Sequence, residues 1–244
     1  MTPPQETLVA PVSDRPAGPD HIAPAGALIC APEDIIDIGA LSGALEEECV
    51  AHEGDALAIR GGVTRLLSEA AKSGRAAIGA AFEAQPLAAR EMVHAYAYLT
   101  DALVGAAFWT ARRFLHPLHN PTTSERLALC AVGGYGRAEM SPQSDVDLLF
   151  LTPYKITPWA ESVIESTLYI LWDLHMKVGH ASRTVKDCLR LGKSDYTIRT
   201  SLIELRFLAG DETLSAELHD RLREELFSST GKDFIEAKLE ERAE

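Results

Sequence analysis

The stretch GGYGRAEMSPQSDVD occupies residues 133–147 and follows the apolar run LALCAV at 127–132. A short apolar run that ends in glycines is typical of a buried strand followed by a tight turn. We therefore expect one strand at 127–132 and a second, equally apolar strand at 145–151. Alternate side chains of a strand share a face, so Asp145 and Asp147 should point the same way. The sequence thus predicts two carboxylates beside a glycine turn, on a rigid and buried element.

These residue types suit a phosphate and a metal ion. Two neighbouring carboxylates repel each other unless a cation lies between them, and Mg2+ is a hard cation that takes oxygen ligands and brings substrate phosphates with it. Glycine has no Cβ, so the backbone at this turn can approach a phosphate closely and present its N–H donors. Arg137 can add a charged fork for a phosphate, and Ser144 either donates a hydroxyl or orients the turn before the first acid. We predict that Asp145 and Asp147 are catalytic and bind Mg2+, and that Gly133, Gly134, Arg137 and Ser144 bind a nucleotide.

Neither half of this pattern is specific by itself. An isolated Asp-x-Asp is mostly surface decoration, and an isolated Gly-Gly is usually only a turn. The two together, in this order and between two apolar strands, are far more specific. The segment is not a P-loop, because no Gly-Lys-Ser/Thr follows the glycines, and Glu139 excludes Gly-x-Gly-x-x-Gly.

A helical region is predicted before the segment. Apolar residues there recur at spacings of three and four, which makes one face of a helix. Pro86 suits the first turn of that helix, and Pro117 ends it. The apolar stripe is expected to pack in the core and comprises Met92, Tyr96, Leu99, Leu103 and Ala106.

After the second strand the sequence predicts a helix, a strand and another helix. Thr157 should cap the first helix, and Gly179 should stop it. A third strand is expected at 180–185, and Ser194 should cap the next helix, with Leu205 on its inward face. From Leu214 the chain is charged and helical. This order predicts an α+β fold, a mixed sheet with packed helices that is preceded by a helical layer.

Composition excludes some partners. The 244 residues carry 36 acidic and 23 basic side chains, a formal net charge of -13, whereas a duplex-binding protein usually shows a basic excess. Nucleic acid is therefore not an expected partner. The longest apolar stretch, 95–111, is broken by Thr100 and Asp101, and no signal pattern starts the chain, so we expect a cytoplasmic protein without membrane association. The four cysteines lack zinc or redox spacing and are expected to be free thiols.

One family matches these motifs. The run GGYGRAEMSPQSDVDLLFL at 133–151 closely resembles the nucleotidyltransferase domain of the bacterial protein-PII uridylyltransferase/uridylyl-removing enzymes. VGHASRTVKDC at 178–188 and SDYTIRTSLIELRFLAGD at 194–211 look like the continuation of the same domain. The resemblance implies a DNA polymerase β-like core and the Mg2+-dependent transfer of UMP from UTP to a tyrosine of the nitrogen-regulatory PII protein, with release of pyrophosphate.

The resemblance also implies a domain order. We expect a disordered leader at 1–33, a helical region at 34–120, the nucleotidyltransferase core at 121–215 and a charged, solvated helical tail at 216–244. In the family a metal-dependent HD hydrolase and two ACT domains follow. The one adjacent His-Asp pair, at 219–220, has no histidine after it, so those domains are not expected here and the chain looks truncated.

Two points stay open in the sequence. DNA polymerase β-like enzymes often carry a third carboxylate on the next strand, but 180–185 contains no acid; Asp187 and Glu204 lie nearby, and Glu204 is expected to be solvated. His180 and Arg183 should lie on opposite faces of that strand, with His180 and Ser182 beside the nucleotide. Transfer to another acceptor, or a silent nucleotide-binding module without turnover, remain the alternatives to the uridylylation of PII.

Overall fold

The structure is a computed structural model that describes residues 27–119, 122–227 and 239–240. Its centre is a four-stranded mixed sheet with the order β3-β2-β1-β4. β1 pairs antiparallel with β2 and with β4, and β2 pairs parallel with β3. The α+β class predicted from the sequence is confirmed, while its DNA polymerase β-like nature stays a prediction. The strands are β1 (Ala128–Ala131), β2 (Val146–Thr152), β3 (Val178–Thr184) and β4 (Arg206–Gly210).

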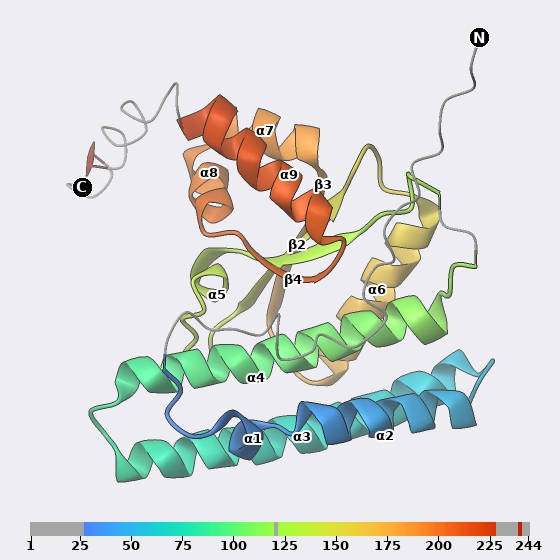
Figure 1. Ribbon diagram of the computed structural model, residues 1–244, viewed down its shortest axis with the longest axis vertical. Coiled ribbons are helices and arrows are strands. Elements are labelled where there is room, and N and C mark those ends of the chain that lie inside the picture. Colours follow the sequence, from blue (N-terminus) through green and yellow to red (C-terminus); the bar gives the residue numbers. More distant parts are fainter. Residues whose placement is uncertain (1–26, 120–121, 228–238, 241–244) are drawn as a thin grey trace.

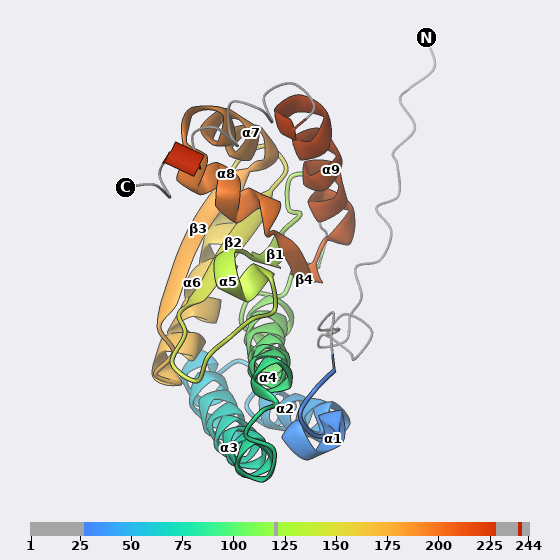
Figure 2. The same ribbon diagram turned by 90° about the vertical axis from the view of Figure 1, so that its left-hand side faces the viewer.

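Helices cover both faces of the sheet (Figure 1, Figure 2). Because side chains alternate along a strand, the two central strands feed two separate cores. Leu148 and Phe150 of β2 join a cluster with α3, α4 and α6, whereas Leu149 and Leu151 join a cluster with α7, α8 and α9. Both faces of this strand are therefore buried, which explains its continuous apolar sequence.

The helical layer expected before the segment is present. The predicted apolar stripe lies on α4, where Leu99, Leu103 and Ala106 are buried and Met92 and Tyr96 pack against the same cluster. The helices of this layer are α1 (Pro32–Ile35), α2 (Ile38–Ala51), α3 (Ala56–Ala84), α4 (Ala89–Thr110) and the π-helical turn η1 (Ala111–Leu115).

The predicted limits of α4 are half right. The helical structure ends at Leu115, before Pro117, as expected. Pro86, however, lies before the helix, whose N-cap is Ala88. The prediction that Pro86 lies in the first turn was therefore wrong.

The helix after β2 begins as predicted and ends differently. The hydroxyl of Thr157 accepts a hydrogen bond from the amide of Ala160 at 3.2 Å, with Pro158 in the first turn of α6 (Pro158–Asp173). The helix stops long before Gly179, since His175 adopts a left-handed backbone with φ 58°. Gly179 lies inside β3, so its prediction as a helix stop was wrong.

Three helices cover the other face of the sheet: α7 (Val185–Ser194), α8 (Tyr196–Ile203) and α9 (Glu212–Leu222), with the π-helical turn η2 (Arg223–Phe227) after them. The sequence missed α7 and β4. Ser194 was wrongly predicted as a cap: it ends α7, and Asp195 caps α8 by accepting hydrogen bonds from Thr197 and Ile198. Leu205 is buried, but it lies between α8 and β4 rather than in a helix.

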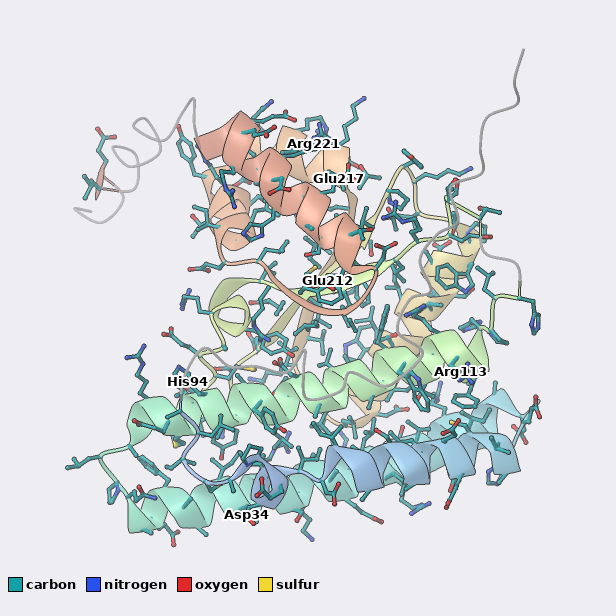
Figure 3. The ribbon with its side chains drawn as sticks, viewed as in Figure 1. Asp34, His94, Arg113, Glu212, Glu217 and Arg221 are labelled. Carbon is teal, nitrogen blue, oxygen red and sulfur yellow. The ribbon has the colours of Figure 1, made fainter. Side chains whose placement is uncertain are left out.

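The predicted leader and tail are only partly described. Residues 1–26, 228–238 and 241–244 lie outside the described residues. Within the leader stretch, Ile29 is buried and α1 begins at Pro32, so packing starts earlier than expected. In the tail stretch, Leu218 of α9 is buried in the cluster between this helix and the sheet. Its neighbour Glu217 is exposed (Figure 3). Within the described ranges, no helix has the length and apolar character that crossing a membrane requires.

One buried ion pair joins the helical layer to the sheet. Arg206 of β4 donates from Nη1 and Nη2 to the carboxylate of Asp101 on α4, at 2.6 and 3.1 Å. Its remaining donors reach the carbonyl oxygens of Tyr135 and Gly136, at 3.1 and 3.2 Å. Burial raises the pKa of Asp101, and the charge and hydrogen bonds of Arg206 oppose that rise. The pair therefore connects α4, β4 and the glycine turn at one point.

Breaking this pair from one side should destabilise the protein strongly. In Asp101→Leu the charge of Arg206 loses its partner in a buried place, and we expect a loss of about 3–5 kcal/mol in the free energy of unfolding. The double variant Asp101→Leu, Arg206→Met removes both charges and should recover part of that loss. Urea unfolding followed by circular dichroism measures both.

The exposed ion pair between Arg60 and Asp173, 3.3 Å apart, provides the control. Asp173→Asn should cost less than about 1 kcal/mol, because surface pairs contribute little. A loss in Asp101→Leu no larger than in Asp173→Asn would contradict the structural role of the buried pair.

Candidate active site

The glycine pair begins a single helical turn, α5 (Gly133–Gly136), where the sequence predicted an irregular turn. Gly133 has φ 62°, a left-handed conformation that side chains with a Cβ rarely adopt. The first turn of a helix leaves its amides without intrahelical partners, so Gly133 and Gly134 present N–H groups at this end. The turn starts directly after β1, and the carbonyl oxygen of Asp147 accepts a hydrogen bond from Val132 at 3.1 Å. The glycines and the second acid are thus neighbours.

The carboxylate of Asp147 lies between two glycines. A Cβ added at Gly133 would lie 3.2 Å from Asp147 Oδ2, and a Cβ added at Gly179 would lie 2.5 Å from Asp147 Oδ1. Gly179 is the direct partner of Asp147 in the parallel pairing of β2 with β3. Any side chain at position 179 would displace the acid. Gly179 is therefore a candidate site residue that the sequence does not reveal, because the sequence predicts a helix stop at this position, whereas it lies inside β3.

The two acids influence each other. Asp145 is exposed just before β2, and Asp147 is partly buried in the strand. Burial raises the pKa of Asp147, and the negative charge of Asp145 raises it further. A cation between them would relieve both effects. The structure thus brings the predicted acids together, with an electrostatic need for a positive partner.

These residues fit Mg2+ in its usual protein setting. Among the described residues no group of three or more His, Cys, Asp or Glu side chains could hold a metal ion. Mg2+, however, is commonly bound by one or two carboxylates, with water and substrate phosphates as the other ligands. The pair Asp145 and Asp147 next to the amides of α5 meets that description. Mg2+ binding stays a prediction.

Arg137 lies beside the glycine turn but is held by two acids. A Cβ added at Gly134 would lie 3.6 Å from Arg137 Nη2. Arg137 donates from Nε to Glu139 at 3.0 Å and from Nη1 to Glu204 at 2.5 Å. These hydrogen bonds raise the pKa of Arg137, so its charge is secure. To bind a phosphate, Arg137 has to exchange one of these partners.

Neither candidate for a third carboxylate is available without a rearrangement. Glu204 was expected to be solvated, but its side chain is only 20% exposed and it pairs with Arg137. Asp187 accepts a hydrogen bond from the hydroxyl of Thr184 at 2.7 Å and another from the guanidinium of Arg190 at 3.1 Å. It belongs to the start of α7. The face of β3 beside Asp147 carries no acid, as the sequence predicted.

Ser144 belongs to the loop before the first acid. Its hydroxyl accepts a hydrogen bond from the amide of Ser141 at 2.9 Å, and its own amide donates to the Ser141 carbonyl at 3.0 Å. Of the two roles open to it in the sequence, this arrangement fits the orientation of the turn. A contact with a nucleotide stays a prediction.

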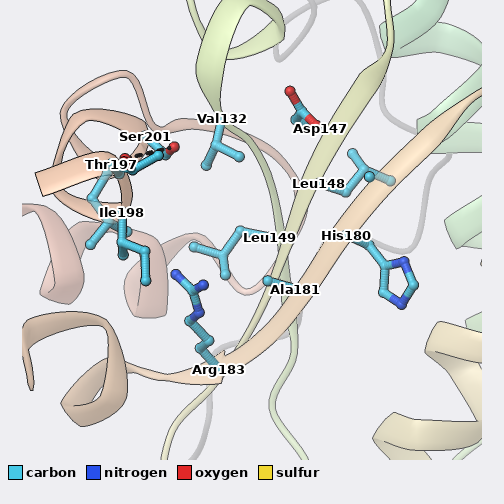
Figure 4. Close-up of a pocket in the computed structure, with 12 residues that line it drawn as sticks. Val132, Asp147, Leu148, Leu149, His180, Ala181, Arg183, Thr197, Ile198 and Ser201 are labelled. Carbon is cyan, nitrogen blue, oxygen red and sulfur yellow. Dashed lines mark hydrogen bonds between the residues drawn. The ribbon is translucent and has the colours of Figure 1, made fainter. Parts of the chain in front are cut away.

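A pocket of about 260 Å³ opens beside Asp147, between the β2–β3 pair and α8 (Figure 4). Its walls are mostly apolar, with Arg183 at the end away from Asp147. The lining residues are Val132, Asp147, Leu148, Leu149, Gly179, His180, Ala181, Arg183, Thr197, Ile198, Ser201 and Leu202.

The face of β3 that turns its side chains toward the pocket is the opposite of the predicted one. His180 and Arg183 do lie on opposite faces, but the ring of His180 points away from the pocket and packs on Trp172 of α6, with ring centroids 6.3 Å apart. Ser182 shares that face because it lies two residues further along the strand. The prediction that His180 and Ser182 line the pocket is therefore only half right: His180 is a lining residue although its ring points away, and Ser182 is not one. Arg183 takes that place.

Comparisons with known proteins identify relatives of this chain. No protein-family model matches the chain. Three curated relatives are each named bifunctional uridylyltransferase/uridylyl-removing enzyme. The one from Ruegeria pomeroyi is 59% identical over 195 residues, 80% of this chain and 22% of the relative. Those from Cereibacter sphaeroides and Phenylobacterium zucineum are 54% and 45% identical over 97% and 87% of this chain, and 25% and 22% of the relatives. The resemblance seen in the sequence is confirmed, and the chain spans about a quarter of these relatives' length.

Filling the space at Gly179 should disturb the acid without unfolding the protein. In Gly179→Ala the new methyl group pushes the carboxylate of Asp147 aside, and we expect Mg2+-dependent binding of a nucleoside triphosphate to weaken about 10- to 100-fold, as for other changes around metal ligands. Calorimetric titration measures the affinity. Gly79→Ala on α3, with nothing within 4 Å of the added Cβ, is the control and should bind normally. Equal binding by both variants would contradict the role of Gly179.

Neutralising Asp147 should stabilise the metal-free protein. Because the pKa of Asp147 is raised in the folded state, its ionised form opposes folding above that pKa. Asp147→Asn should raise the free energy of unfolding at pH 7 by less than about 1 kcal/mol, because solvent screens this partly exposed charge. The difference should shrink as the pH falls through the pKa of Asp147 and the wild-type acid becomes protonated.

Asp187 provides a control of opposite sign. Hydrogen bonds from Thr184 and Arg190 lower its pKa, so its ionised form favours folding. Asp187→Asn should therefore be less stable than the wild type at neutral pH, with a difference that vanishes in acid. Thermal unfolding between pH 3 and pH 8 in the presence of a chelator follows both variants. A destabilised Asp147→Asn at pH 7 would refute the argument.

Proposed function

We propose that this chain, which over 97% of its length is related to part of the bifunctional uridylyltransferase/uridylyl-removing enzymes, is a DNA polymerase β-like nucleotidyltransferase domain. It transfers UMP from UTP to a tyrosine of the PII protein. The observation that supports this most directly is the position of the Asp147 carboxylate, between Gly133 of α5 and Gly179 of β3. That arrangement joins a phosphate-binding turn to a metal-binding acid.

The chain's own residues suit an in-line phosphoryl transfer. The amides of Gly133 and Gly134 donate to phosphate oxygens of UTP and hold the triphosphate at the start of α5. Asp145 and Asp147 are the residues that would hold Mg2+, which when bound neutralises phosphate charge and activates the attacking hydroxyl. The acceptor tyrosine releases its proton to solvent and its oxygen bonds to the α-phosphorus, while the bond between that phosphorus and the oxygen bridging to the β-phosphate breaks. Pyrophosphate leaves. Positioning and charge stabilisation supply most of the rate.

Arg137 contributes when its partners change. It pairs with Glu139 and Glu204 in this structure, and the approach of a triphosphate offers it stronger acceptors. The side chain of Glu204 is only 20% exposed and pairs with Arg137. Its release from Arg137 would therefore leave a poorly solvated carboxylate near the glycine turn. Arg137 is thus a residue whose pairing responds to the nucleotide.

One observation favours a second candidate. The residues of β3 on the face of Asp147 are Gly179, Ala181 and Arg183, none of them an acid. A domain with this set can bind a nucleotide with Mg2+ and still turn over slowly or not at all. A silent nucleotide-binding module is therefore the alternative, and transfer to another acceptor is a third.

Label transfer distinguishes these candidates. The protein is mixed with α-labelled UTP, Mg2+, ATP, 2-oxoglutarate and purified PII, and we expect label on PII. The variant Asp145→Ala, Asp147→Ala should lose this activity by at least about 100-fold, since two metal ligands are removed. The control Asp187→Ala removes an acid of α7 outside the pair and should keep the activity.

Each other outcome points to one alternative. UTP binding in calorimetry without label on any acceptor would support the silent module. Label on RNA or on small molecules supplied as acceptors, but not on PII, would support transfer to another acceptor. Absence of both label and UTP binding would refute the nucleotidyltransferase assignment.

A further inference from the structure

The pocket beside Asp147 continues well beyond the acid pair. Its volume of about 260 Å³ lies on the sheet face covered by α7 and α8. Pockets for drug-sized ligands occupy roughly 300–1,000 Å³, so this one suits a single small ring and its substituents. Gly179, which faces Asp147, and Arg183, at the other end, lie four residues apart on β3. That separation is about 13 Å along a strand.

Arg183 has an unusual electrostatic position. In the part of the chain that the structure describes, its guanidinium forms no ion pair and no hydrogen bond, whereas Arg137, Arg190 and Arg206 each pair with a carboxylate. The buried thiol of Cys188 is close enough to feel the charge of Arg183, but burial raises the pKa of that thiol to about 12 and it stays neutral. The Arg183 side chain is partly buried among mostly apolar walls, so its donors are open to the acceptor of a ligand that enters the pocket.

The chemical character of the pocket lining changes from one end of the pocket to the other. Asp147 lies at one end, apolar side chains of Val132, Leu149 and Ile198 form the middle, and Arg183 lies at the far end (Figure 4). A nucleotide whose phosphates lie at the glycine turn and the acids would place its sugar and base along the apolar middle. The base edge farthest from the sugar then meets Arg183. In a pyrimidine that edge carries the substituent at position 4 and the nitrogen at position 3.

We propose, on the basis of the function proposed above, that this pocket holds the uracil ring of UTP and that Arg183 donates hydrogen bonds to the O4 carbonyl. Cytosine carries an amino group at that position, a donor that would face the guanidinium without an acceptor. A site built to bond one polar group rejects an analogue that lacks it, because its own buried group stays unpaired. Arg183 is thus the residue that selects uracil over cytosine.

A hydroxyl in the same pocket supports this choice. Ser201 of α8 donates to the carbonyl oxygen of Thr197 at 3.2 Å, which leaves the lone pairs of its oxygen as acceptors (Figure 4). Uracil has a donor at N3, whereas cytosine has an acceptor there. A donor at Arg183 and an acceptor at Ser201 therefore match uracil at both positions.

The test measures binding of three probes, each with Mg2+: UTP, CTP and inorganic tripolyphosphate. The wild type should prefer UTP to CTP. Arg183→Met should weaken UTP binding about 10- to 100-fold, the effect of losing a hydrogen bond to a charged group, and should leave CTP and tripolyphosphate almost unchanged. Arg183→Lys keeps the charge without the fork and should retain part of the preference. Arg190→Met removes the same charge from the outside of α7 and should bind all three probes like the wild type.

The outcomes separate the two proposals. If Arg183→Met and Arg183→Lys keep the wild-type ratio of UTP to CTP affinity, the role of Arg183 is refuted while the nucleotidyltransferase assignment stands. If Arg183→Met loses tripolyphosphate binding while its thermal unfolding is unchanged, Arg183 binds phosphate and this inference is wrong. If the wild type binds none of the three probes, the proposed function itself fails and this inference fails with it.

Discussion

The buried ion pair of Arg206 and Asp101 is the interaction on which the geometry of the site depends. Arg206 is the first residue of β4, Asp101 lies in the middle of α4, and the remaining donors of Arg206 hold carbonyl oxygens of α5. A charge as poorly exposed as that of Asp101, at 3%, is tolerated only with a close partner. The pair therefore fixes the glycine turn relative to both the helical layer and the sheet. A phosphate site made of backbone amides has no side chains to adjust it, so its support has to be rigid.

The site itself is shaped by side chains that are missing. Asp147 occupies a gap left by two glycines, one from α5 and one from the neighbouring parallel strand. Burial in this gap raises the pKa of Asp147, and the charge of Asp145, two residues earlier in the chain, raises it further. The chain thus holds an acid in a place where its charge is unfavourable, a cost that a cation bound there would relieve. Such local conflict between stability and chemistry is common at functional sites.

The sequence predicted the centre of the molecule well and its periphery less well. The two strands around the glycine turn, the paired acids and the cap at Thr157 depend on residues close together in the chain, and the structure has them. The sequence did not predict Gly179 and Arg183 as candidate site residues. Their positions depend on the register of β3 against β2, a long-range pairing that no local pattern encodes. β4 was missed because RFLAG is short and lacks a clear alternation, and because its pairing with β1 is again a long-range one. Asp101 was noticed only as an interruption of an apolar stretch.

The distribution of positive charge distinguishes the two ends of the candidate site. A protein with a net charge of -13 repels a triphosphate at long range, so binding has to rely on local donors. Two arginines border the site at different ends, Arg137 beside the glycine turn and Arg183 at the far end of the pocket. Arg137 is held by two carboxylates, while Arg183 has no carboxylate partner among the described residues. The first is suited to a strong, competitive acceptor such as a phosphate, which can displace a carboxylate. Arg183, which lies in a mostly apolar pocket, is suited to a neutral carbonyl group, because such a group could not displace a carboxylate partner. The different pairing of these two residues therefore supports the proposal that the phosphates lie at the α5 end of the site and the base at the β3 end.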